Sequence, residues 1–373
     1  MSIALGQANP FSLMPDNKKT RVVVGLSGGV DSSAAASLLV KQGYDVVGIT
    51  LKVWPQDCVS RAEDKCCGPQ AVMDARSVAD KLDIPYYLVD ESREFQRDVI
   101  DYFAAEYKAG RTPNPCVMCN EKLKFGNLID RARKLGAEYV ATGHYARLEQ
   151  RDGRTVLLRG RDARKDQTYF LFSLGQEQLA HMMFPLGELQ KSETREVARC
   201  VNLKTAEKQE SQEICFVPDK DYKKFLTTAG LVEEHRGEIV DTRGQVLGHH
   251  DGIEFYTIGQ RKGLGISSPS PMYVIELDPE NNRVVVGGEA LLLRDEFRID
   301  RCNWVAFERL AKPIEASAAI RYNHPGTEAT VIPGENGQAT VKLREPQRAV
   351  TPGQACVFYQ DDLVVGGGWI MRN

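Results

Sequence analysis

The stretch Arg21-Val-Val-Val-Gly25-Leu-Ser-Gly-Gly-Val-Asp-Ser32 decides the fold class of this chain. Three consecutive valines are typical of a strand that is buried on both faces of a parallel sheet. The next residues, 33–42, are good helix formers, and Gly43 follows them where helices commonly end. The stretch therefore predicts a buried strand, a loop of glycine and serine, and a helix in succession.

Strand and helix patterns continue to alternate beyond this stretch. Apolar, β-branched runs predict the strands, and apolar residues at helical spacing predict the helices. The strands are expected at 45–53, 86–89 and 139–142, and the helices at 70–82, 95–108 and 121–135. Such alternation predicts an α/β layer built on a parallel sheet.

The pattern of the sequence changes after residue 222. Short runs of alternating apolar and polar residues follow, separated by turn dipeptides such as Asn336-Gly337 and Pro352-Gly353. This pattern predicts an all-β region that ends in a small closed barrel. The expected parts are a flexible tail, an α/β domain, a small central mainly-β domain and a C-terminal β-barrel, at residues 1–17, 18–222, 223–294 and 295–373.

The loop at residues 27–32 has the properties of a phosphate site. Glycines let the backbone approach phosphate oxygens, and amides at the start of the helix add positive potential. Asp31 is unusual there, because a carboxylate repels phosphates unless it helps to hold Mg²⁺ or caps the helix. The loop lacks the GxxxxGK[ST] pattern of γ-phosphate-transferring enzymes. It resembles the SGGxDS signature of the PP-loop ATP pyrophosphatases, which cleave ATP between the α and β phosphates.

Charge is distributed unevenly along the chain. The net charge is −3, yet Lys108 to Lys165 holds 14 lysines and arginines against six acidic residues. A basic stretch in an acidic protein indicates a localised site for a polyanion, although a solvated basic surface is the simpler interpretation of this feature alone. The absence of a long apolar run argues against a membrane span, and the first 17 residues do not read as a secretory signal.

The nine cysteines are odd in number, so we expect most of them to be reduced in a cytoplasm. The most unusual segment is Thr112-Pro-Asn-Pro-Cys116-Val-Met-Cys119-Asn120. If Asn120 caps the following helix, Cys119 lies at a helix N-terminus with two lysines one turn away. Positive potential of this kind lowers a thiol pKa, which makes Cys119 a candidate nucleophile.

A second thiol lies far away in sequence, at Cys215. Two distant thiols and a nucleotide site suggest sulfur chemistry, in which one thiol carries a persulfide and the other resolves it. The alternative is that Cys215 is a small core hydrophobe. Three further cysteines in apolar stretches are expected to be structural, namely Cys200, Cys302 and Cys356.

A metal interpretation also remains open. Cys116 and Cys119 have the C-x-x-C spacing of zinc or iron–sulfur ligands. No second C-x-x-C completes a zinc site, although His144 or Cys215 could extend the set. Cys116, Cys119 and Cys215 could instead hold an iron–sulfur cluster with one open iron.

From residue 21 to residue 372 the chain resembles the tRNA-specific 2-thiouridylases, the tRNA uridine 2-sulfurtransferase family. The matching segments are Gly25-Leu-Ser-Gly-Gly-Val-Asp-Ser32, Leu51-Lys-Val-Trp54, Thr112-Pro-Asn-Pro115 with Cys119-Asn120, Ala141-Thr-Gly-His-Tyr145, Lys165-Asp-Gln-Thr-Tyr-Phe-Leu171, Ile214-Cys-Phe216, Thr257-Ile-Gly-Gln-Arg-Lys-Gly-Leu-Gly265 and Arg321-Tyr322.

The resemblance implies a reaction and a set of roles. ATP adenylates O2 of the wobble uridine (position 34) of a tRNA and releases pyrophosphate, and persulfide sulfur then displaces AMP. Cys119 resembles the nucleophile and Cys215 the persulfide carrier. The implied ATP contacts are Gly25, Leu26, Ser27, Gly28, Gly29, Val30, Asp31, Ser32, Leu51 and Gly143. The implied contacts to tRNA and target base are Asn114, Pro115, Cys116, Lys165, Asp166, Gln167, Arg321 and Tyr322.

The sequence departs from the family pattern at one position. Many members carry an aspartate three residues before the nucleophile, where an acid–base role is implied, and this chain has Cys116 there. The departure puts that acid–base role in doubt and strengthens the three-cysteine cluster alternative.

The expected partners are tRNA and a persulfide donor, either a cysteine desulfurase or a relay protein. The expected cofactor is ATP with Mg²⁺, and the protein is expected to be a cytoplasmic monomer without membrane association. Two functions of other classes stay open. One is a PP-loop ligase for a small molecule, with the cysteines as bystanders, and the other is a non-enzymatic ATP or redox sensor.

Overall fold

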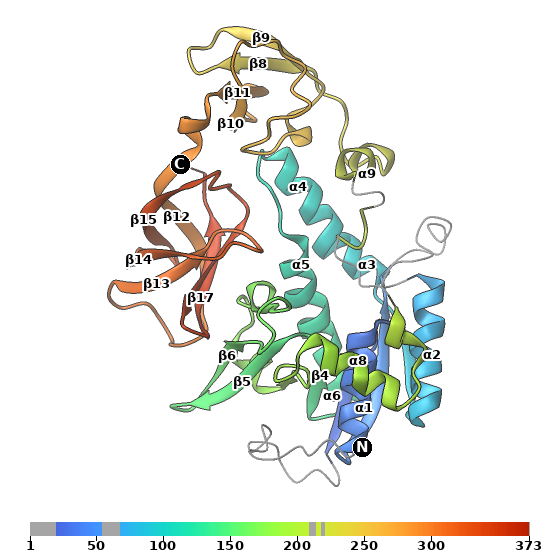
Figure 1. Ribbon diagram of the computed structural model, residues 1–373. Helices are drawn as coiled ribbons and strands as arrows, with labels where there is room; N and C mark the ends of the chain where they lie inside the picture. Colours follow the sequence, from blue (N-terminus) through green and yellow to red (C-terminus); the bar gives the residue numbers. More distant parts are fainter. Residues whose placement is uncertain (1–19, 54–67, 209–213, 218–220, 373) are drawn as a thin grey trace.

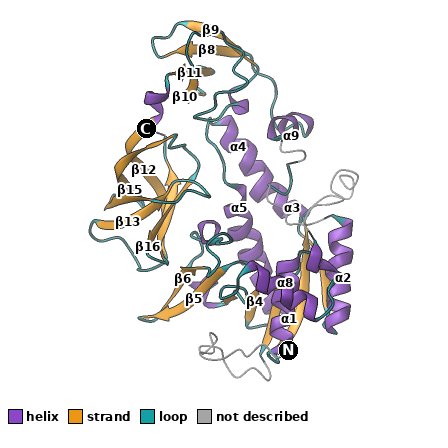
Figure 2. Ribbon diagram, in the orientation of Figure 1, coloured by secondary structure: helices purple, strands orange, loops and turns teal. Residues whose placement is uncertain are grey.

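The computed structural model describes residues 20–53, 68–208, 214–217 and 221–372. The expected tail at 1–17 and the cysteine pair at 66–67 lie outside these residues. The α/β part, a small β unit and a β-barrel are separate regions of the ribbon, and helices dominate the first part while strands dominate the other two (Figures 1 and 2). The fold class expected from the sequence is confirmed.

The α/β part is built on a five-stranded parallel sheet with the order β3-β2-β1-β4-β7. Its strands are β1 (Arg21–Gly25), β2 (Asp45–Lys52), β3 (Tyr86–Asp90), β4 (Tyr139–Ala141) and β7 (Met182–Met183). The three valines of β1 are fully buried at the centre of this sheet. A ligand site of a parallel sheet lies at the carboxyl ends of its strands, so the loop after β1 is in the expected place.

Helices pack around this sheet and extend away from it. They are α1 (Val30–Lys41), α2 (Pro69–Leu82), α3 (Ser92–Phe95), α4 (Tyr102–Lys108), α5 (Pro115–Met118), α6 (Leu128–Lys134), α7 (Gln176–Ala180), α8 (Lys191–Cys200) and α9 (Tyr222–Thr228). Two π-helical stretches, η2 (Gln96–Asp101) and η3 (Cys119–Asn127), join α3 to α4 and α5 to α6. One continuous helical segment therefore runs from Pro115 to Lys134.

The start of that segment corrects one sequence prediction. Asn120 does not cap a helix, because it lies inside the helical segment and its side-chain amide donates to the Phe170 carbonyl at 3.0 Å. The N-cap position is held by Asn114, and Pro115 follows at the first helical position, where its missing N–H costs nothing. Cys119 consequently lies one turn inside the helix rather than at its N-terminus.

The central unit is a four-stranded sheet with the order β10-β11-β8-β9. Its strands are β8 (Gly237–Asp241), β9 (Val246–His250), β10 (Tyr273–Asp278) and β11 (Arg283–Gly287). Val274 and Val284 of this sheet share one hydrophobic cluster with Phe103 of α4. Helix α4 thus contributes to a hydrophobic core that the α/β part shares with the central unit.

The C-terminal region is a closed six-stranded barrel, because β12 pairs with both β15 and β17. Its strands are β12 (Leu293–Trp304), β13 (Ile314–Ala319), β14 (Thr327–Pro333), β15 (Ala339–Arg348), β16 (Ala355–Gln360) and β17 (Leu363–Ile370). Trp369 is buried in a cluster that also contains Phe172 of the α/β part. The barrel is therefore packed against the core of the α/β part.

A hairpin of the α/β part joins the barrel sheet, and the sequence prediction missed it. Strands β5 (Ala146–Arg151) and β6 (Arg154–Arg159) pair with each other, and Leu158 pairs with Leu363 of β17. The turn between them is Asp152-Gly153, with φ of 50° and 76°. An Asp-Gly turn between apolar runs is a strong hairpin signal, so this element was predictable.

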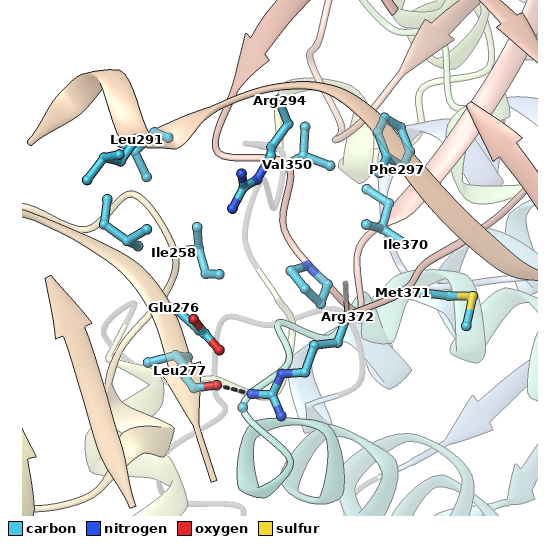
Figure 3. Close-up of a pocket in the computed structure, with 14 residues that line it drawn as sticks. Ile258, Glu276, Leu277, Leu291, Arg294, Phe297, Val350, Ile370, Met371 and Arg372 are labelled. Carbon is cyan, nitrogen blue, oxygen red and sulfur yellow. Dashed lines mark hydrogen bonds between the residues drawn. The ribbon is translucent and has the colours of Figure 1, made fainter. Parts of the chain in front are cut away.

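A cavity lies where the three parts meet, with a volume of about 120 Å³ (Figure 3). Gly110 follows α4, Leu277 belongs to β10, and Arg294 and Arg372 belong to the barrel region. The Arg372 guanidinium donates to the Leu277 carbonyl. Gly110 has φ of 67°, and a Cβ there would lie 3.0 Å from the Arg372 side chain. The segment that follows α4 and the end of the barrel region are therefore closely packed, and the cavity includes none of the predicted site residues.

Candidate functional site

The loop between β1 and α1 is held by its own side chains. Ser32 Oγ accepts a hydrogen bond from the Ser27 amide at 3.1 Å and donates one to the Gly29 carbonyl at 3.2 Å. Gly28 has φ of 70°, and a Cβ there would lie 2.2 Å from the Ala71 carbonyl oxygen. The first amides of α1 follow directly and have no intrahelical acceptor. This geometry suits the oxygens of a bound phosphate.

Asp31 is neutralised by a lysine that the sequence prediction missed. It lies in the first turn of α1, and Gly29 holds the N-cap position, so capping, one of the two roles left open for Asp31, is excluded. Its carboxylate pairs with Lys191 Nζ at 2.6 Å and accepts a hydrogen bond from the Tyr145 hydroxyl at 3.0 Å. Lys191 begins α8 and its side chain is only 12% exposed. Its charge offsets the repulsion that Asp31 would exert on a phosphate.

Gly143 contacts the same loop from the carboxyl end of β4. A Cβ at this position would lie 2.6 Å from the Ser32 amide nitrogen and 2.7 Å from the Asp31 carbonyl carbon. Leu51 lies near the carboxyl end of β2. The Leu26 amide donates a hydrogen bond to the Ile49 carbonyl of that strand at 2.8 Å. The structure thus brings the residues of all three predicted ATP-contact segments to one edge of the sheet.

A second missed lysine closes the other side of the loop. Lys208 Nζ donates to the Gly28 carbonyl at 3.1 Å and pairs with Asp74 of α2 at 2.6 Å. It lies 180 positions from Gly28, and no local pattern marks it. Two ammonium groups therefore flank the glycine loop, and each is paired with a carboxylate, so the acidic side chains around the loop are neutralised.

The two proposed reactive thiols contact one hydrophobic cluster. Cys119 and Cys215 are both half-buried, and both pack against the buried cluster that contains Phe103 and Phe216. Leu51 packs against this cluster and also against the main core of the α/β sheet. The thiols, which are 96 positions apart, thus pack against the same cluster, which Leu51 joins to the core of the sheet.

The three cysteines do not fit an iron–sulfur cluster or a zinc site in this arrangement. All three of Cys116, Cys119 and Cys215 are described. Within the described ranges, no three His, Cys, Asp or Glu side chains are grouped so as to hold a metal ion. A cluster needs at least three thiolates around one set of irons, so no step of the chemistry is assigned to one.

An aromatic site lies between the barrel and the α/β part. Tyr322 lies in the segment after β13. The centroid of its ring lies 4.4 Å from the centroid of the Phe170 ring and 6.0 Å from that of the Tyr169 ring. Burial raises the pKa of Tyr322, the nearby charges of Asp166 and Cys116 raise it further, and Lys165 opposes them. Asn114 hydrogen-bonds with the Tyr169 side chain. The predicted tRNA and base contacts, which are scattered over the sequence, thus converge near Tyr322.

Two of these predicted contacts are engaged inside the protein. The buried Asp166 carboxylate accepts from Arg159 at 2.9 Å, from the Gly160 amide at 3.1 Å and from the Thr168 hydroxyl at 2.9 Å. Gln167 Oε1 accepts from the Tyr145 amide at 3.0 Å. These bonds shape the loop. Lys165, which precedes Asp166 in this loop, is half-buried, and Arg321 is exposed, so a phosphate backbone can reach both cations.

The remaining sequence candidates have structural roles or none. His144 is buried, and its Nδ1 lies within hydrogen-bond distance of the Thr142 hydroxyl, at 2.8 Å. Burial, and to a smaller extent the charge of Lys124, lowers its pKa well below the ordinary value. Burial raises the pKa of Cys302 to about 12 and raises that of Cys356 as well, in agreement with structural thiols. Cys200 is exposed at the end of α8, so its expected structural role is wrong.

Family models match the chain in three consecutive parts. The matches are to a tRNA methyl transferase HUP domain at residues 20–219, a tRNA methyl transferase PRC-barrel domain at 223–288 and an aminomethyltransferase beta-barrel domain at 294–370. Curated relatives match over nearly the whole length. The tRNA-specific 2-thiouridylase MnmA of Clostridium perfringens (strain 13 / Type A) is 49% identical over 353 residues, which cover 94% of this chain and 98% of the relative. This chain belongs to the tRNA-specific 2-thiouridylase family.

Other members of the family match equally well. The enzyme of Moorella thermoacetica is 50% identical over 351 residues, covering 93% of this chain and 98% of its own, and that of Geobacter metallireducens is 49% identical over 362 residues, covering 96% and 98%. Among solved structures, a 4-thiouridine synthetase in complex with RNA and ATP aligns with 57% of this chain and 50% of its own at 18% identity. Its TM-score of 0.33 is too low to support an argument. In the described part of the chain, no helix is both long and apolar enough to cross a bilayer.

Proposed function

We propose that this chain is an ATP-dependent tRNA-uridine 2-sulfurtransferase that replaces O2 of the wobble uridine, position 34, with sulfur. The observation that carries the proposal is the position of Leu51. This residue packs against the core of the sheet that presents the glycine loop and against the cluster that Cys119 and Cys215 contact. This shared contact supports a nucleotide site and a sulfur site that act on one uridine, as a two-step reaction requires.

In the first step ATP activates the base. The triphosphate lies over the glycine loop, with Lys191 and Lys208 offsetting charge around it. O2 of the uridine attacks the α phosphate, and pyrophosphate leaves. An oxygen bonded to C2 is a poor leaving group, whereas AMP leaves readily. ATP arrives with Mg²⁺, which supplies charge neutralisation on the phosphates.

In the second step sulfur replaces AMP. Cys215 carries a persulfide from an external donor, a cysteine desulfurase or a relay protein, and Cys119 is the nucleophile that resolves it. Both thiols are half-buried, which keeps the persulfide accessible to the substrate yet shielded from bulk oxidants. The outer persulfide sulfur bonds to C2, and the C2–O bond to AMP breaks. The Cys119 thiolate then attacks Sγ of Cys215, the bond between Sγ and the transferred sulfur breaks, and the two cysteines end as a disulfide.

The target base enters between the two large parts of the molecule. An anticodon base must be unstacked to reach an enclosed site, and aromatic rings supply a surface for it. Tyr322 and Phe170 offer such a surface, and Lys165, which is half-buried, and Arg321, which is exposed, supply positive charge for the backbone phosphates. The barrel thus contacts the anticodon arm from the side opposite the sheet.

The test asks whether protein without iron can thiolate tRNA. Iron-stripped protein receives unmodified tRNA, ATP, Mg²⁺ and a persulfide donor, and 2-thiouridine is quantified by nucleoside mass spectrometry. We expect product from wild type and from the matched control Cys200→Ala, and none from Cys119→Ala or Cys215→Ala.

Two outcomes would overturn parts of the proposal. Product that depends on reloaded iron would replace the persulfide route by a cluster route. ATP cleavage that proceeds without tRNA, and is undisturbed by Cys119→Ala, would favour a small-molecule ligase.

A further inference from the structure

Cys116 is a thiol that the proposed reaction does not use. It occupies the second position of the helical segment that begins at Pro115, and Cys119 follows three residues later. Residues three apart in a helix lie on the same face. Both thiols are half-buried. Cys116 is therefore a second thiol on the same helical face as the nucleophile, one turn before it.

The proposed function leaves an oxidised product in the protein. The outer sulfur of a persulfide is more oxidised than the sulfur of 2-thiouridine, so its transfer needs two electrons. The thiols of Cys119 and Cys215 supply these electrons and end as a disulfide. That disulfide removes both reactive groups, and the enzyme cannot begin a second turnover until it is opened.

We propose that Cys116 is the resolving thiol that opens this disulfide. The Cys116 thiolate attacks Sγ of Cys119, a bond forms between these two sulfurs, and the bond between Cys119 and Cys215 breaks. Cys215 leaves as a thiolate and can accept sulfur again. An external protein dithiol then reduces the Cys116–Cys119 disulfide to two thiols and is itself oxidised to a disulfide. This inference rests on the proposed sulfurtransferase function.

The local geometry suits this exchange. A C-x-x-C pair in the first turns of a helix is the arrangement of dithiol redox motifs, and the helix start favours the thiolate. The α-carbons of residues three apart in a helix fall within the range that a disulfide spans. Cys215, in contrast, belongs to a separate segment, 96 positions from Cys119, and packs against the same hydrophobic cluster. The exchange moves the oxidised bond from a long-range pair to a pair within one helical segment.

The experiment maps the disulfide after one turnover. Protein carrying a persulfide on Cys215 reacts with tRNA and ATP without reductant, free thiols are alkylated, and peptides are analysed by mass spectrometry without reduction. In wild type we expect the Cys116–Cys119 disulfide and an alkylated Cys215. In Cys116→Ser we expect the Cys119–Cys215 disulfide. We also measure the steady-state rate with a dithiol reductant and divide it by the rate of the first turnover. This ratio should fall about tenfold in Cys116→Ser.

The first turnover is the reference because it divides out any effect of Cys116 on base binding. Cys200→Ser, which removes an exposed thiol on α8, is the matched control and should keep the wild-type ratio. The 2-thiouridine in the same sample separates the two proposals. Product together with a wild-type Cys119–Cys215 disulfide and an alkylated Cys116 overturns the resolving role and leaves the sulfurtransferase standing. An absence of product overturns the sulfurtransferase itself. The wild-type map does not depend on the variant folding.

Discussion

The ring of Tyr322 in the barrel lies 4.4 Å from the ring of Phe170 in the α/β part, at an angle of 42°. The two residues are 152 positions apart, and their contact is where the barrel meets the loop that carries Lys165. Tyr322 remains 37% exposed. Under the proposed function, this contact lets residues of two domains contact one base.

Tyr322→Ala is expected to lower kcat/KM for tRNA by about tenfold or more, because stacking of a base on an aromatic ring contributes about 1–3 kcal/mol. Tyr322→Phe keeps the ring and should retain most activity. Tyr87→Ala, which removes an exposed tyrosine on the edge strand β3, is the matched control. Equal losses in the Phe and Ala variants would assign the effect to the hydroxyl and contradict stacking.

Lys191→Met leaves the Asp31 carboxylate uncompensated beside the glycine loop. We expect ATP affinity to fall about tenfold, because an unpaired carboxylate repels the triphosphate in a partly desolvated site. Adding Asp31→Asn should restore part of the affinity, and nucleotide titrations of the two single variants and the double variant form the cycle. A double variant that binds ATP no better than Lys191→Met would mean that the lysine acts directly on the phosphates.

Gly143→Ala should impair both the fold and ATP binding. Its Cβ would lie 2.6 Å from the Ser32 amide and 2.7 Å from the Asp31 carbonyl carbon, and both are backbone atoms. Overpacking of this kind costs about 1–3 kcal/mol. Gly288→Ala is the control, since nothing lies within 4 Å of its added Cβ. Chemical denaturation and ATP titration measure the two effects, and wild-type values for Gly143→Ala would contradict the close approach.

His144 predicts a loss of stability in mild acid. Burial and Lys124 hold its pKa well below the ordinary value, so the folded protein keeps it neutral. Above about pH 6.5 the histidine is neutral in both states and contributes no pH dependence. As the pH falls below that value, the unfolded chain takes up a proton that the folded chain refuses, and stability drops by up to about 1.4 kcal/mol per pH unit.

Urea denaturation at pH 7.5 and pH 5.5 measures this loss. His144→Gln should show a smaller difference between the two pH values than wild type, even if it is less stable at both. His249→Gln removes an exposed histidine on β9 and should keep the wild-type difference. The buried His250 also has a lowered pKa and adds to the acid sensitivity of both proteins. An unchanged difference in His144→Gln would contradict the assignment.

Local patterns predicted the parts of the fold that local physics determines. The valines of β1 and the glycine loop are contiguous, so the strand, the loop and α1 could be read directly from them. The cap of the thiol-bearing helix was placed wrongly at Asn120, although Asn114-Pro115 already carried the signal of a helix start. The missed hairpin carried its own signal in Asp152-Gly153. These two errors came from signals that were present and were not used.

Long-range relationships in the site could not be predicted in this way. Lys191 and Lys208 reach the loop from 160 and 180 positions away, and many lysines in the chain have similar surroundings in sequence. Cys119 and Cys215 pack against one hydrophobic cluster that is built from many separate segments of the chain. Only the resemblance to a family linked these residues beforehand, and tertiary packing supplies the physical reason.

The pairing of the β5–β6 hairpin with β17 affects how the chain is made. Synthesis proceeds from the N-terminus, so Leu158 emerges long before its partner Leu363 exists. During that interval β6 has an unpaired strand edge, a feature that recruits other strands and promotes aggregation. Long-range pairing of this kind also slows folding. A chain that stops before β17 would therefore leave the ribosome with the edge of β6 unpaired and prone to aggregation. Strand β17, which is synthesised much later than the β5–β6 hairpin, covers that edge.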